Sequence, residues 1–296
     1  MNKMEQKPYT SAGTCVAFGC FDGVHLGHRA VLSRLLQERE LTPVVVTLEP
    51  RGKVLSTPEE KVFLMQQLGV EHMISLPADG VGCPEDFVRR VLLEQLGAKK
   101  VVLARGYTFG ADDSGNAALL RSMGLEVEEV ERVALDGCPV TGQEIREAFA
   151  AGAFSRAAAL LGGGYLMMGP VVHGRANGRR HGMPTANLGF GPEKLLPPLG
   201  VYGGVARAAG QRVLGMTNVG RRPSADDFDQ VTVETLLLDF AGDLYGEELI
   251  LELRTYIRPV MKFDGLDQVR QQIDRDILTA RRRMGGAFSG ERASGS

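Results

Sequence analysis

Three glycines and three arginines are interspersed in one short segment of the second half of the chain. Glycines at every fourth position let a backbone turn tightly and approach a ligand, and arginines suit an anionic one. The segment ends in Pro-Thr-Ala-Asn-Leu, where Thr185 and Asn187 face the same side of an extended strand. Their hydroxyl and amide oxygens can hold a hard ion such as the Mg²⁺ that accompanies nucleotide phosphates. The glycines, and the proline before Thr185, are Gly174, Gly178, Gly182 and Pro184.

A second candidate site lies near the N-terminus, in the sequence GCFDGVHLGH. His25 and His28 lie at a turn that follows a predicted strand and opens a predicted helix. Ligands of open parallel sheets bind at the carboxyl ends of strands, and a helix N-terminus attracts phosphate. Two imidazoles there can donate hydrogen bonds to an α-phosphate during an in-line displacement. The alternative is a metal-binding pair or two surface histidines. The other candidate nucleotide-binding residues of the turn are Gly19, Phe21, Asp22, Gly23 and Gly27.

The third candidate is Glu234, a carboxylate inside an otherwise apolar predicted strand. Burying a carboxylate is costly unless it has a partner or a task. Alternation along the strand places Glu234 on the same face as Thr232 and Leu236. A carboxylate positioned there can accept the proton of an attacking hydroxyl group. The structural alternative is a half-exposed strand residue that pairs with an arginine.

The elements that must position the two histidines alternate in type along the first half of the chain. Short runs rich in Val, Ile and Leu predict buried strands, and the amphipathic stretches between them predict helices. This alternation favours an α/β domain with a parallel sheet covered on both faces. The predicted strands are 14–18, 43–48, 72–76, 100–104 and 126–133, and the predicted helices are 28–39, 59–68, 85–96 and 143–161, with a break near Gly152.

After the triple glycine at 162–164 the pattern changes to short runs separated by Gly and Pro. Many short strands with turn residues between them suggest a closed antiparallel barrel, and helical spacing over 266–283 predicts a final helix. We therefore expect domains at 1–162 and 163–284, followed by a disordered tail at 285–296. The predicted strands of the second domain are 165–172, 200–208, 212–218, 232–239 and 248–256.

The composition is that of an ordinary soluble protein. Of the 296 residues, 44% are hydrophobic and 24% charged, and the net charge of −2 favours neither a nucleic-acid nor a membrane surface as a partner. No apolar run is long enough to span a bilayer, and the N-terminus lacks the apolar stretch of a secretion signal. The four cysteines form no CxxC pair and are typical of reduced thiols. We expect a cytoplasmic protein whose partners are small molecules.

Together these motifs resemble those of the bacterial bifunctional riboflavin kinase/FMN adenylyltransferases, also called FAD synthetases. In the second half the resemblance rests on the glycine loop with PTANL at 174–188, GVY at 200–202, GxxNxGxxP at 215–223, Val-Glu at 233–234, DLYG at 243–246 and the ending IR…KF…L…QI..D between 257 and 276. It implies a six-stranded barrel that binds riboflavin and MgATP, whose γ-phosphate the ribityl 5′-hydroxyl attacks. Thr185 and Asn187 are then metal ligands, and Glu234 is the base. The residues that it assigns to flavin binding are Asn218, Arg258, Lys262 and Phe263.

The first half resembles the adenylyltransferase domain of the same family, but three of its motifs differ. The GxFDGxHxGH turn is intact, whereas the family's FEPHP is LEPRG at 48–52. The family's G-x-D/N-F-x-F-G is ARGYTFG at 104–110, with Gly106 in place of the acid or amide. The family's I-S-S-T-x-x-R is VTGQEIR at 140–146, which keeps Thr141 and the nucleotide-binding candidate Arg146. Each lost donor to a developing negative charge reduces the rate roughly 100-fold.

These observations lead to one main hypothesis and two alternatives. The main hypothesis is an enzyme that converts riboflavin and ATP to FMN, with the adenylylation of FMN to FAD weakened or lost. In the first alternative, the N-terminal half is a non-catalytic module that binds a nucleotide or flavin or supports the barrel. In the second, it transfers a nucleotidyl group to another substrate, such as a phosphopantetheine or nicotinate precursor, which leaves the fused kinase half unexplained.

Overall fold

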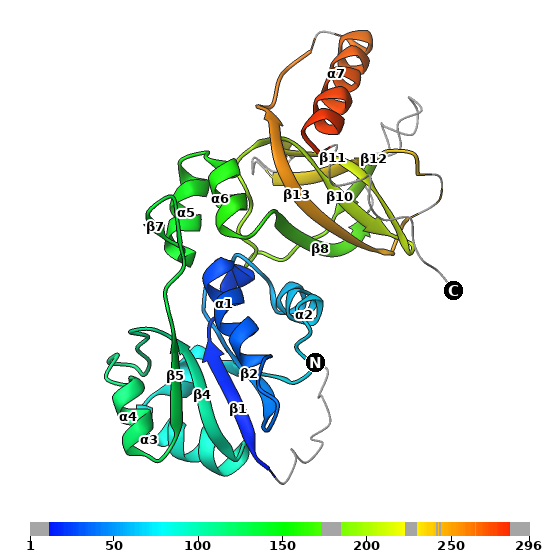
Figure 1. The fold of residues 1–296 in the computed structure, drawn as a ribbon. Coiled ribbons are helices and arrows are strands. Elements are labelled where there is room, and N and C mark those ends of the chain that lie inside the picture. The colour runs from blue at the N-terminus through cyan, green and yellow to red at the C-terminus, as the bar shows by residue number, and fades with distance from the viewer. Residues whose placement is uncertain are drawn as a thin grey trace. The chain divides into compact units, whose positions relative to one another are not determined.

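The computed structural model describes residues 12–172, 185–222, 230–240, 242, 244–263 and 265–284. The chain divides into two compact units, Met1–Gly142 and Gln143–Ser296, and each is described by itself. Figure 1 shows a sheet with helices in the first unit, and a barrel with a long final helix in the second. The fold class expected from the sequence is confirmed. The predicted tail at 285–296 lies outside the described residues.

A five-stranded parallel sheet forms the centre of the first unit, in the order β3-β2-β1-β4-β5. Strand β1 lies between β2 and β4, so the strand order reverses at β1. In open parallel sheets this reversal marks where ligands bind, at the carboxyl ends of the strands. The last residue of β1 directly precedes the histidine turn. The strands are β1 (Thr14–Gly19), β2 (Thr42–Glu49), β3 (Met73–Pro77), β4 (Ala98–Ala104) and β5 (Glu126–Val130).

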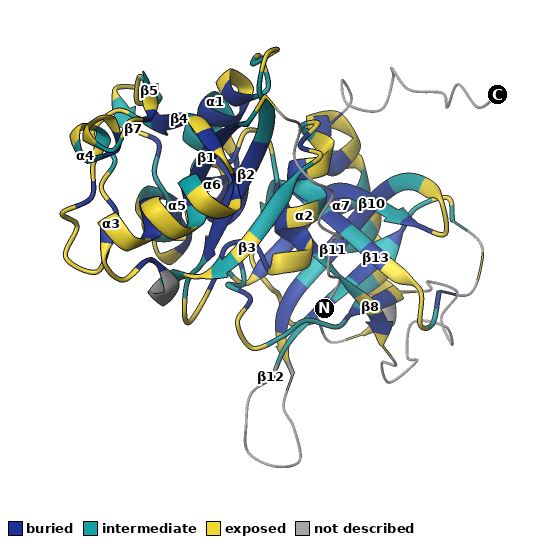
Figure 2. Ribbon diagram, turned by 90° about the horizontal axis from the view of Figure 1, so that it is seen from below, coloured by how far each residue is buried: buried dark blue, intermediate teal, exposed yellow. Residues whose placement is uncertain are grey.

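Both faces of this sheet are buried under helices. Successive strand residues point to opposite faces, so each strand contributes to both clusters. Val16 and Phe18 pack on one face and Cys15 and Ala17 on the other. Figure 2 shows the buried strands between helices whose outer sides are exposed. Helices α1 (Leu26–Leu35) and α2 (Pro58–Gln67) contribute to the cluster around Cys15. The cluster around Phe18 is covered by α3 (Pro84–Phe87), its continuation η3 (Val88–Gln95) and α4 (Ala117–Ser122).

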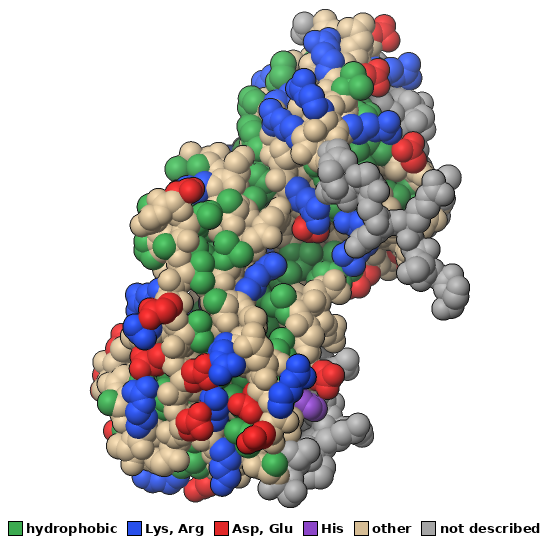
Figure 3. Space-filling view, viewed as in Figure 1, with side chains coloured by type: hydrophobic (Ala, Val, Ile, Leu, Met, Phe, Trp, Pro, Cys, Tyr) green, Lys and Arg blue, Asp and Glu red, His purple; other side chains and the backbone are tan. Residues whose placement is uncertain are grey.

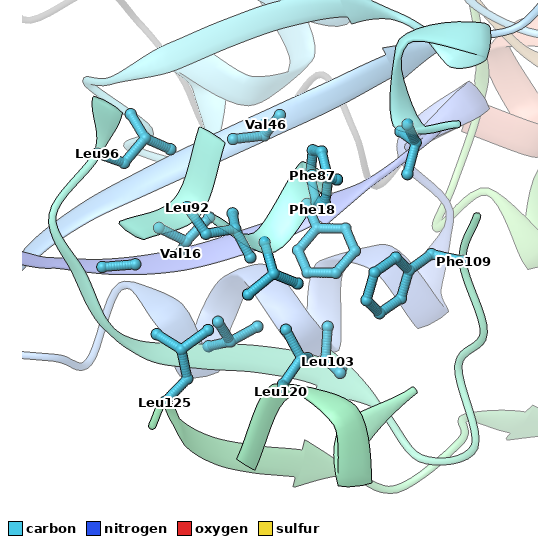
Figure 4. Packing of buried hydrophobic residues seen from close by; sticks show 14 of the residues in the cluster. Val16, Phe18, Val46, Phe87, Leu92, Leu96, Leu103, Phe109, Leu120 and Leu125 are labelled. Atoms are coloured by element: carbon cyan, nitrogen blue, oxygen red, sulfur yellow. The ribbon is translucent and has the colours of Figure 1, made fainter. Parts of the chain in front are cut away.

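An aromatic cluster anchors the face of the sheet that carries Phe18. Phe18 from β1 meets Phe87 from α3 and Phe109 from the loop after β4, with ring centroids 5.2 and 4.9 Å away in edge-on arrangements (Figure 4). Edge-to-face pairs of this kind add about 0.5–1.5 kcal/mol each beyond the area that they bury. The cluster therefore ties the end of β1 to the ARGYTFG segment.

Several local elements differ from the prediction. Helix α1 begins at Leu26, earlier than the predicted 28–39, because the His25 side chain caps it. The predicted helix 85–96 changes from α-helical to π-helical hydrogen bonding at Val88. Helix α4 was not predicted, since it is too short for periodicity to reveal, and Asn116 caps it by accepting from two backbone N–H groups. The remaining short elements are η1 (Asp22–Val24), η2 (Ala78–Val81), β6 (Ala134–Leu135) and β7 (Cys138–Pro139).

The second unit is a closed six-stranded antiparallel barrel with the strand order β10-β11-β12-β9-β8-β13. Two helices precede it, α5 (Gly142–Ala150) and α6 (Phe154–Leu160), with the predicted break at Gly152 between them. Phe149 of α5 and Phe154 of α6 pack on barrel tyrosines, which explains why these helices group with the barrel. The barrel strands are β8 (Tyr165–Val172), β9 (Thr185–Leu188), β10 (Gly200–Ala208), β11 (Gln211–Arg222), β12 (Gln230–Leu237) and β13 (Glu248–Arg258).

The final helix α7 (Leu266–Met284) packs on the outside of the barrel, against β10, β11 and β13. Its Ala280 joins an apolar cluster with Val201 and Met216. A Cβ atom at Gly203 would lie only 3.0 Å from the Ala280 Cβ, so the glycine allows this close approach. The outer side of α7 carries exposed arginines, and Figure 3 shows Lys and Arg side chains gathered around this end of the unit. Among the described residues, no helix is long and apolar enough to cross a membrane.

Candidate active sites

The histidine turn of the first unit has an unusual backbone. Phe21 and Val24 both have positive φ angles, of 46° and 43°, and Gly23 between them has a φ of 77°. A β-branched residue such as Val24 rarely adopts this left-handed conformation. Such strain costs on the order of 1–3 kcal/mol per residue and is concentrated at functional sites. The turn therefore needs contacts with the rest of the unit that hold it in place.

Asp22 and Ser56 provide those contacts. The carboxylate of Asp22 accepts a hydrogen bond of 2.9 Å from the backbone N–H of Ser56, and the Ser56 hydroxyl accepts one of 2.8 Å from the backbone N–H of Gly23. All these groups are buried, and hydrogen bonds to a buried charged group are worth about 1.5–3 kcal/mol. Asp22, predicted to bind nucleotide, thus holds the turn against the segment before α2.

His25 and His28 lie face to face at the start of α1. Their rings are stacked, with centroids 3.5 Å apart and planes 18° apart. The backbone N–H of His28 donates a hydrogen bond of 3.3 Å to Nδ1 of His25, so the neutral His25 ring carries its proton on Nε2. Burial lowers the pKa of His25 to about 4, although Asp22 opposes the shift. His25 is therefore a neutral hydrogen-bond donor at neutral pH.

His28 is also held neutral. Burial, and to a smaller extent the charges of His25 and Lys61, lower its pKa well below the usual range. Its Nδ1 atom is buried and has no hydrogen-bond partner among the described residues, which is unusual for a buried polar atom. A Cβ atom at Gly27 would lie 3.1 Å from both the His25 ring and the carbonyl oxygen of Val140. Glycine at this position therefore lets the ring and the Val140 segment come together.

The motifs that depart from the family pattern have their own contacts. Gly106 has a φ of +67°, and the Arg132 guanidinium donates hydrogen bonds to the carbonyl oxygens of Arg105 and Gly106. This side of the loop thus presents a cation where the family has an acid or amide. Arg146 lies in α5, which belongs to the second unit.

Sequence reasoning missed one buried polar network in the first unit. Lys61 of α2 is 1% exposed, and its ammonium lies 2.8 Å from the carboxylate of Glu49 at the end of β2. Glu49 also accepts hydrogen bonds from the hydroxyls of Ser75 (2.7 Å) and Thr47 (2.9 Å). Burial alone would raise the pKa of Glu49, but the hydrogen bonds, with Lys61 foremost, lower it. The sequence predicts that a lysine in an amphipathic helix is exposed, so only its tertiary contacts reveal that Lys61 is buried.

In the second unit, the predicted polar residues lie across neighbouring strands. Glu234 of β12 is the cross-strand partner of Asn187 on β9 and of Asn218 on β11. Side chains of directly opposite residues project from the same face of a sheet, with Cβ atoms about 4.5–5.5 Å apart. All three residues are half-buried, whereas the residues next to them in sequence are buried. The row therefore lies on the outer face of the barrel.

Buried residues inside the barrel show which way the side chains of these strands point. Thr217 and Thr235, next to Asn218 and Glu234, are buried and their hydroxyls are hydrogen-bonded at 2.9 Å. Because their side chains point inward, those of Asn218 and Glu234 must point outward. Thr185, two residues before Asn187, shares its face and is exposed. The other residues predicted for this site, Gly174, Gly178, Gly182 and Pro184, lie outside the described residues.

Arg258 extends the same row, because Val201 of β10 pairs with both Asn218 and Arg258. Its guanidinium is bound by Asp276 of α7, with N–O distances of 2.9 Å. Gln272 of α7 donates a further hydrogen bond of 2.8 Å to the same carboxylate. The Arg258 guanidinium also lies 5.8 Å from the ring centre of Phe263, and Lys262 is exposed. Arg258 thus connects the row to the segment before α7.

Comparison with known proteins agrees with the division of the chain into two units. Residues 7–143 match the family model described as FAD synthetase, and residues 161–284 match the model described as riboflavin kinase. The bifunctional riboflavin kinase/FMN adenylyltransferase of Pseudomonas fluorescens is 33% identical over 288 residues, which cover 90% of this chain and 92% of the relative. That of Escherichia coli K12 is 32% identical, with 95% of each chain covered. The chain belongs to the bifunctional riboflavin kinase/FMN adenylyltransferase family.

A solved structure described as a macrolide-efflux protein from Streptococcus pneumoniae is 29% identical, with a TM-score of 0.78 and 92% of this chain and 95% of that chain covered. The two bifunctional relatives match both units, because their alignments cover 90% and 95% of this chain. The barrel unit is a riboflavin kinase domain, and the first unit is an FAD synthetase domain.

Proposed function

We propose that this chain phosphorylates riboflavin to FMN with ATP on the outer face of its barrel, with Glu234 as the general base. The observation that carries this assignment is the shared register of Asn187, Glu234 and Asn218 on three adjacent strands. It gathers a carboxylate and two amides on one accessible face, beside the hydroxyl of Thr185. These groups match those needed to orient a hydroxyl, accept its proton and bind a metal–phosphate complex.

In the reaction, the riboflavin 5′-hydroxyl oxygen attacks the γ-phosphorus of ATP while the bond to the β-phosphate oxygen breaks and ADP leaves. Glu234 accepts the hydroxyl proton. Asn218 lies directly opposite Glu234 on β11, and the role proposed for it is to orient the ribityl chain. Arg258 is bound by Asp276, so its contribution to the flavin site is to hold the segment that carries Lys262 and Phe263.

Thr185 and Asn187 are the proposed Mg²⁺ ligands. A threonine hydroxyl and an asparagine amide are hard oxygen donors, and the strand places them on the same side as the Glu234 carboxylate. This donor set fits a Mg²⁺ ion that keeps several waters and binds mainly to phosphate oxygens. When bound with ATP, the ion neutralises charge on the phosphate oxygens.

For the first unit, we propose adenylylation of FMN to FAD. An oxygen of the FMN phosphate attacks the α-phosphorus of ATP, and pyrophosphate leaves. The two neutral imidazoles of the intact turn are placed to donate hydrogen bonds to the α-phosphate, and Phe21, Gly23 and Gly27 shape that turn. The lost donors in 140–146 favour a slow reaction.

One experiment tests both activities. Purified full-length protein is incubated with riboflavin, ATP and Mg²⁺, and the flavins are separated by chromatography. FMN together with a smaller amount of FAD supports the whole proposal, and FMN alone confines it to the kinase. If neither forms, the kinase assignment fails. Should FMN form alone, calorimetry distinguishes a module that binds nucleotide or flavin with a measurable heat from a scaffold that binds neither.

We also propose that the protein works in the cytoplasm. Small-molecule substrates require no macromolecular partner, and the four cysteines are free thiols, as expected for a cytoplasmic protein. Retention of these thiols in the reduced state by intact cells would support that location, and their oxidation would count against it.

A further inference from the structure

The ion pair of the buried Lys61 and the half-buried Glu49 lies at the carboxyl end of β2, the end of the parallel sheet at which the histidine turn also lies. Lysine is rarely buried unless it is paired, and leaving its buried charge without a partner is strongly destabilising. A second lysine with carboxylate partners, Lys100, lies near the start of β4, at the opposite end of the sheet. The first unit thus offers two lysine–carboxylate clusters, one near the nucleotide turn and one away from it.

Helix α2 connects Lys61 to that turn. Its first turn is a capping box between Thr57 and Glu60, and the backbone N–H of Lys61 donates to the carbonyl oxygen of Thr57 at 2.8 Å. The residue before the cap is Ser56, which is hydrogen-bonded to Asp22 and Gly23. Lys61 is therefore one helical turn away from the contacts that hold the histidine turn.

The two members of the Lys61–Glu49 ion pair have different neighbours. Glu49 faces the hydroxyls of Thr47 and Ser75, on the side of β3. The charge of Lys61 contributes to the lowered pKa of His28, after burial and the charge of His25. Helix α2, which carries Lys61, packs against η1 (Asp22–Val24) of the histidine turn, whereas Glu49 lies on β2 and is hydrogen-bonded to Ser75 of β3.

We propose that Lys61 is a positioning residue of the nucleotide site. Held by Glu49, it fixes a positive charge beside the His25–His28 turn, where that charge favours the anionic phosphates of a bound nucleotide. This inference rests on the proposed adenylyltransferase function of the first unit. Being 1% exposed, Lys61 does not touch the substrate, and it acts through its charge and through its hold on α2.

A fixed charge at this place also has a chemical effect on the turn. Among the described residues, the charges of His25 and of Lys61 on α2 contribute to the lowered pKa of His28, and Asp22 opposes the lowering of the pKa of His25. A neutral imidazole donates a hydrogen bond from its one N–H group. Unlike an imidazolium, it has no second proton that it would release to solvent. Lys61 thereby contributes to keeping His28 a hydrogen-bond donor rather than an acid.

The test compares Lys61→Met, the double variant Lys61→Met/Glu49→Gln, which leaves no unpaired buried charge, and Lys61→Arg, which keeps the charge. Lys100→Met is the matched control. A unit charge on the order of 10 Å from the phosphates, at an effective dielectric constant of about 20, corresponds to about tenfold in binding. We expect the KM for ATP in FAD formation to rise about tenfold in the first two variants, with kcat changing less, and to recover in Lys61→Arg. FMN formation in the same samples should stay unchanged.

A second measurement does not depend on turnover. The chain has five histidines, so their imidazole resonances can be assigned with His25→Gln and His28→Gln and titrated by NMR. In the double variant, the His28 midpoint should move to higher pH, and in Lys100→Met it should not move. An unmoved His28 midpoint overturns the inference, and so does an equal loss of FAD formation in Lys100→Met. If wild-type protein forms no FAD, the adenylyltransferase proposal fails, and the His28 titration still decides the placement of the Lys61 charge.

Discussion

The two units form their sites in different ways. In the barrel, Asn187, Glu234 and Asn218 are neighbours because backbone hydrogen bonds fix the register of three strands. In the first unit, His25 and His28 owe their arrangement to a turn with positive φ angles, held by side-chain contacts such as the bond from Ser56 to Asp22. A framework of backbone hydrogen bonds tolerates substitution of any one outward side chain. A strained turn depends on its few side-chain contacts.

This difference predicts what single substitutions should do. On the barrel, replacing a side chain of the row should remove one chemical group and leave the neighbouring positions unchanged. In the turn, a substitution removes a group and can also release backbone strain, which displaces the other residues. The departures from the family pattern lie outside the histidine turn and outside the barrel motifs, at the ends of β2 and β4 and at the start of α5.

The largest expected effect is that of Glu234→Gln. Losing the general base should reduce FMN formation by roughly 10²–10⁴-fold, while ATP binding stays nearly intact, because the amide keeps the size of the side chain. Steady-state assays of FMN formation and calorimetry with ATP measure the two quantities. Glu248→Gln, at an exposed position at the start of β13, is the control and should keep the wild-type rate. Normal turnover in Glu234→Gln would remove the assignment of the base.

Next in size is His28→Ala. FAD formation should fall by roughly 10²–10³-fold, because a donor to the developing charge on the α-phosphate is lost. FMN formation in the same sample should be spared, since the barrel row contains none of the residues of the turn. Chromatography of the flavin products follows both rates at once. An equal loss of the two activities would show that the units do not work independently.

The pKa of His25 predicts an acid-sensitive first unit. Burial lowers this pKa from 6.5 to about 4, so the contribution of His25 to stability is fully present above pH 6.5 and is lost as the pH falls toward 4. A pKa lowered to about 4 corresponds to a loss of about 3 kcal/mol in total. Urea unfolding between pH 7 and pH 4.5 should show most of this loss in wild-type protein and less in His25→Gln. If both lose the same amount, the neutral buried imidazole is not the cause.

The smallest expected effect is that of Asn187→Ala on the metal requirement. Removing one ligand oxygen should raise the Mg²⁺ concentration for half-maximal FMN formation on the order of tenfold, with rate restored at high Mg²⁺. Because Asn187 is fixed by the strand register, the variant should keep the fold and the ATP binding of the barrel. Asn116→Ala, in the other unit, is the control. An unchanged Mg²⁺ titration would mean that Asn187 does not contact the metal.

Much of the fold was predictable because it depends on local periodicity. Continuous apolar runs identified the buried strands of the first unit, and the runs at 165–172 and 200–208 coincide with β8 and β10. Short elements carried too little periodicity, so α4 and the π-helical continuation of α3 were not predicted. The packing of α5 and α6 with the barrel also escaped prediction, because the aromatic contacts of Phe149 and Phe154 join residues distant in sequence.

By itself, the sequence determined which residue types are available and which face of a strand each occupies, since alternation of side chains is a local property of the backbone. Thr185, Asn187 and Glu234 were recognisable for that reason. The tertiary structure alone decided that Asn187, Glu234 and Asn218 share one register, that Lys61 is buried against Glu49, and that Arg258 is bound by Asp276. Strand pairing and burial depend on contacts between residues far apart in the chain, and no local pattern encodes them.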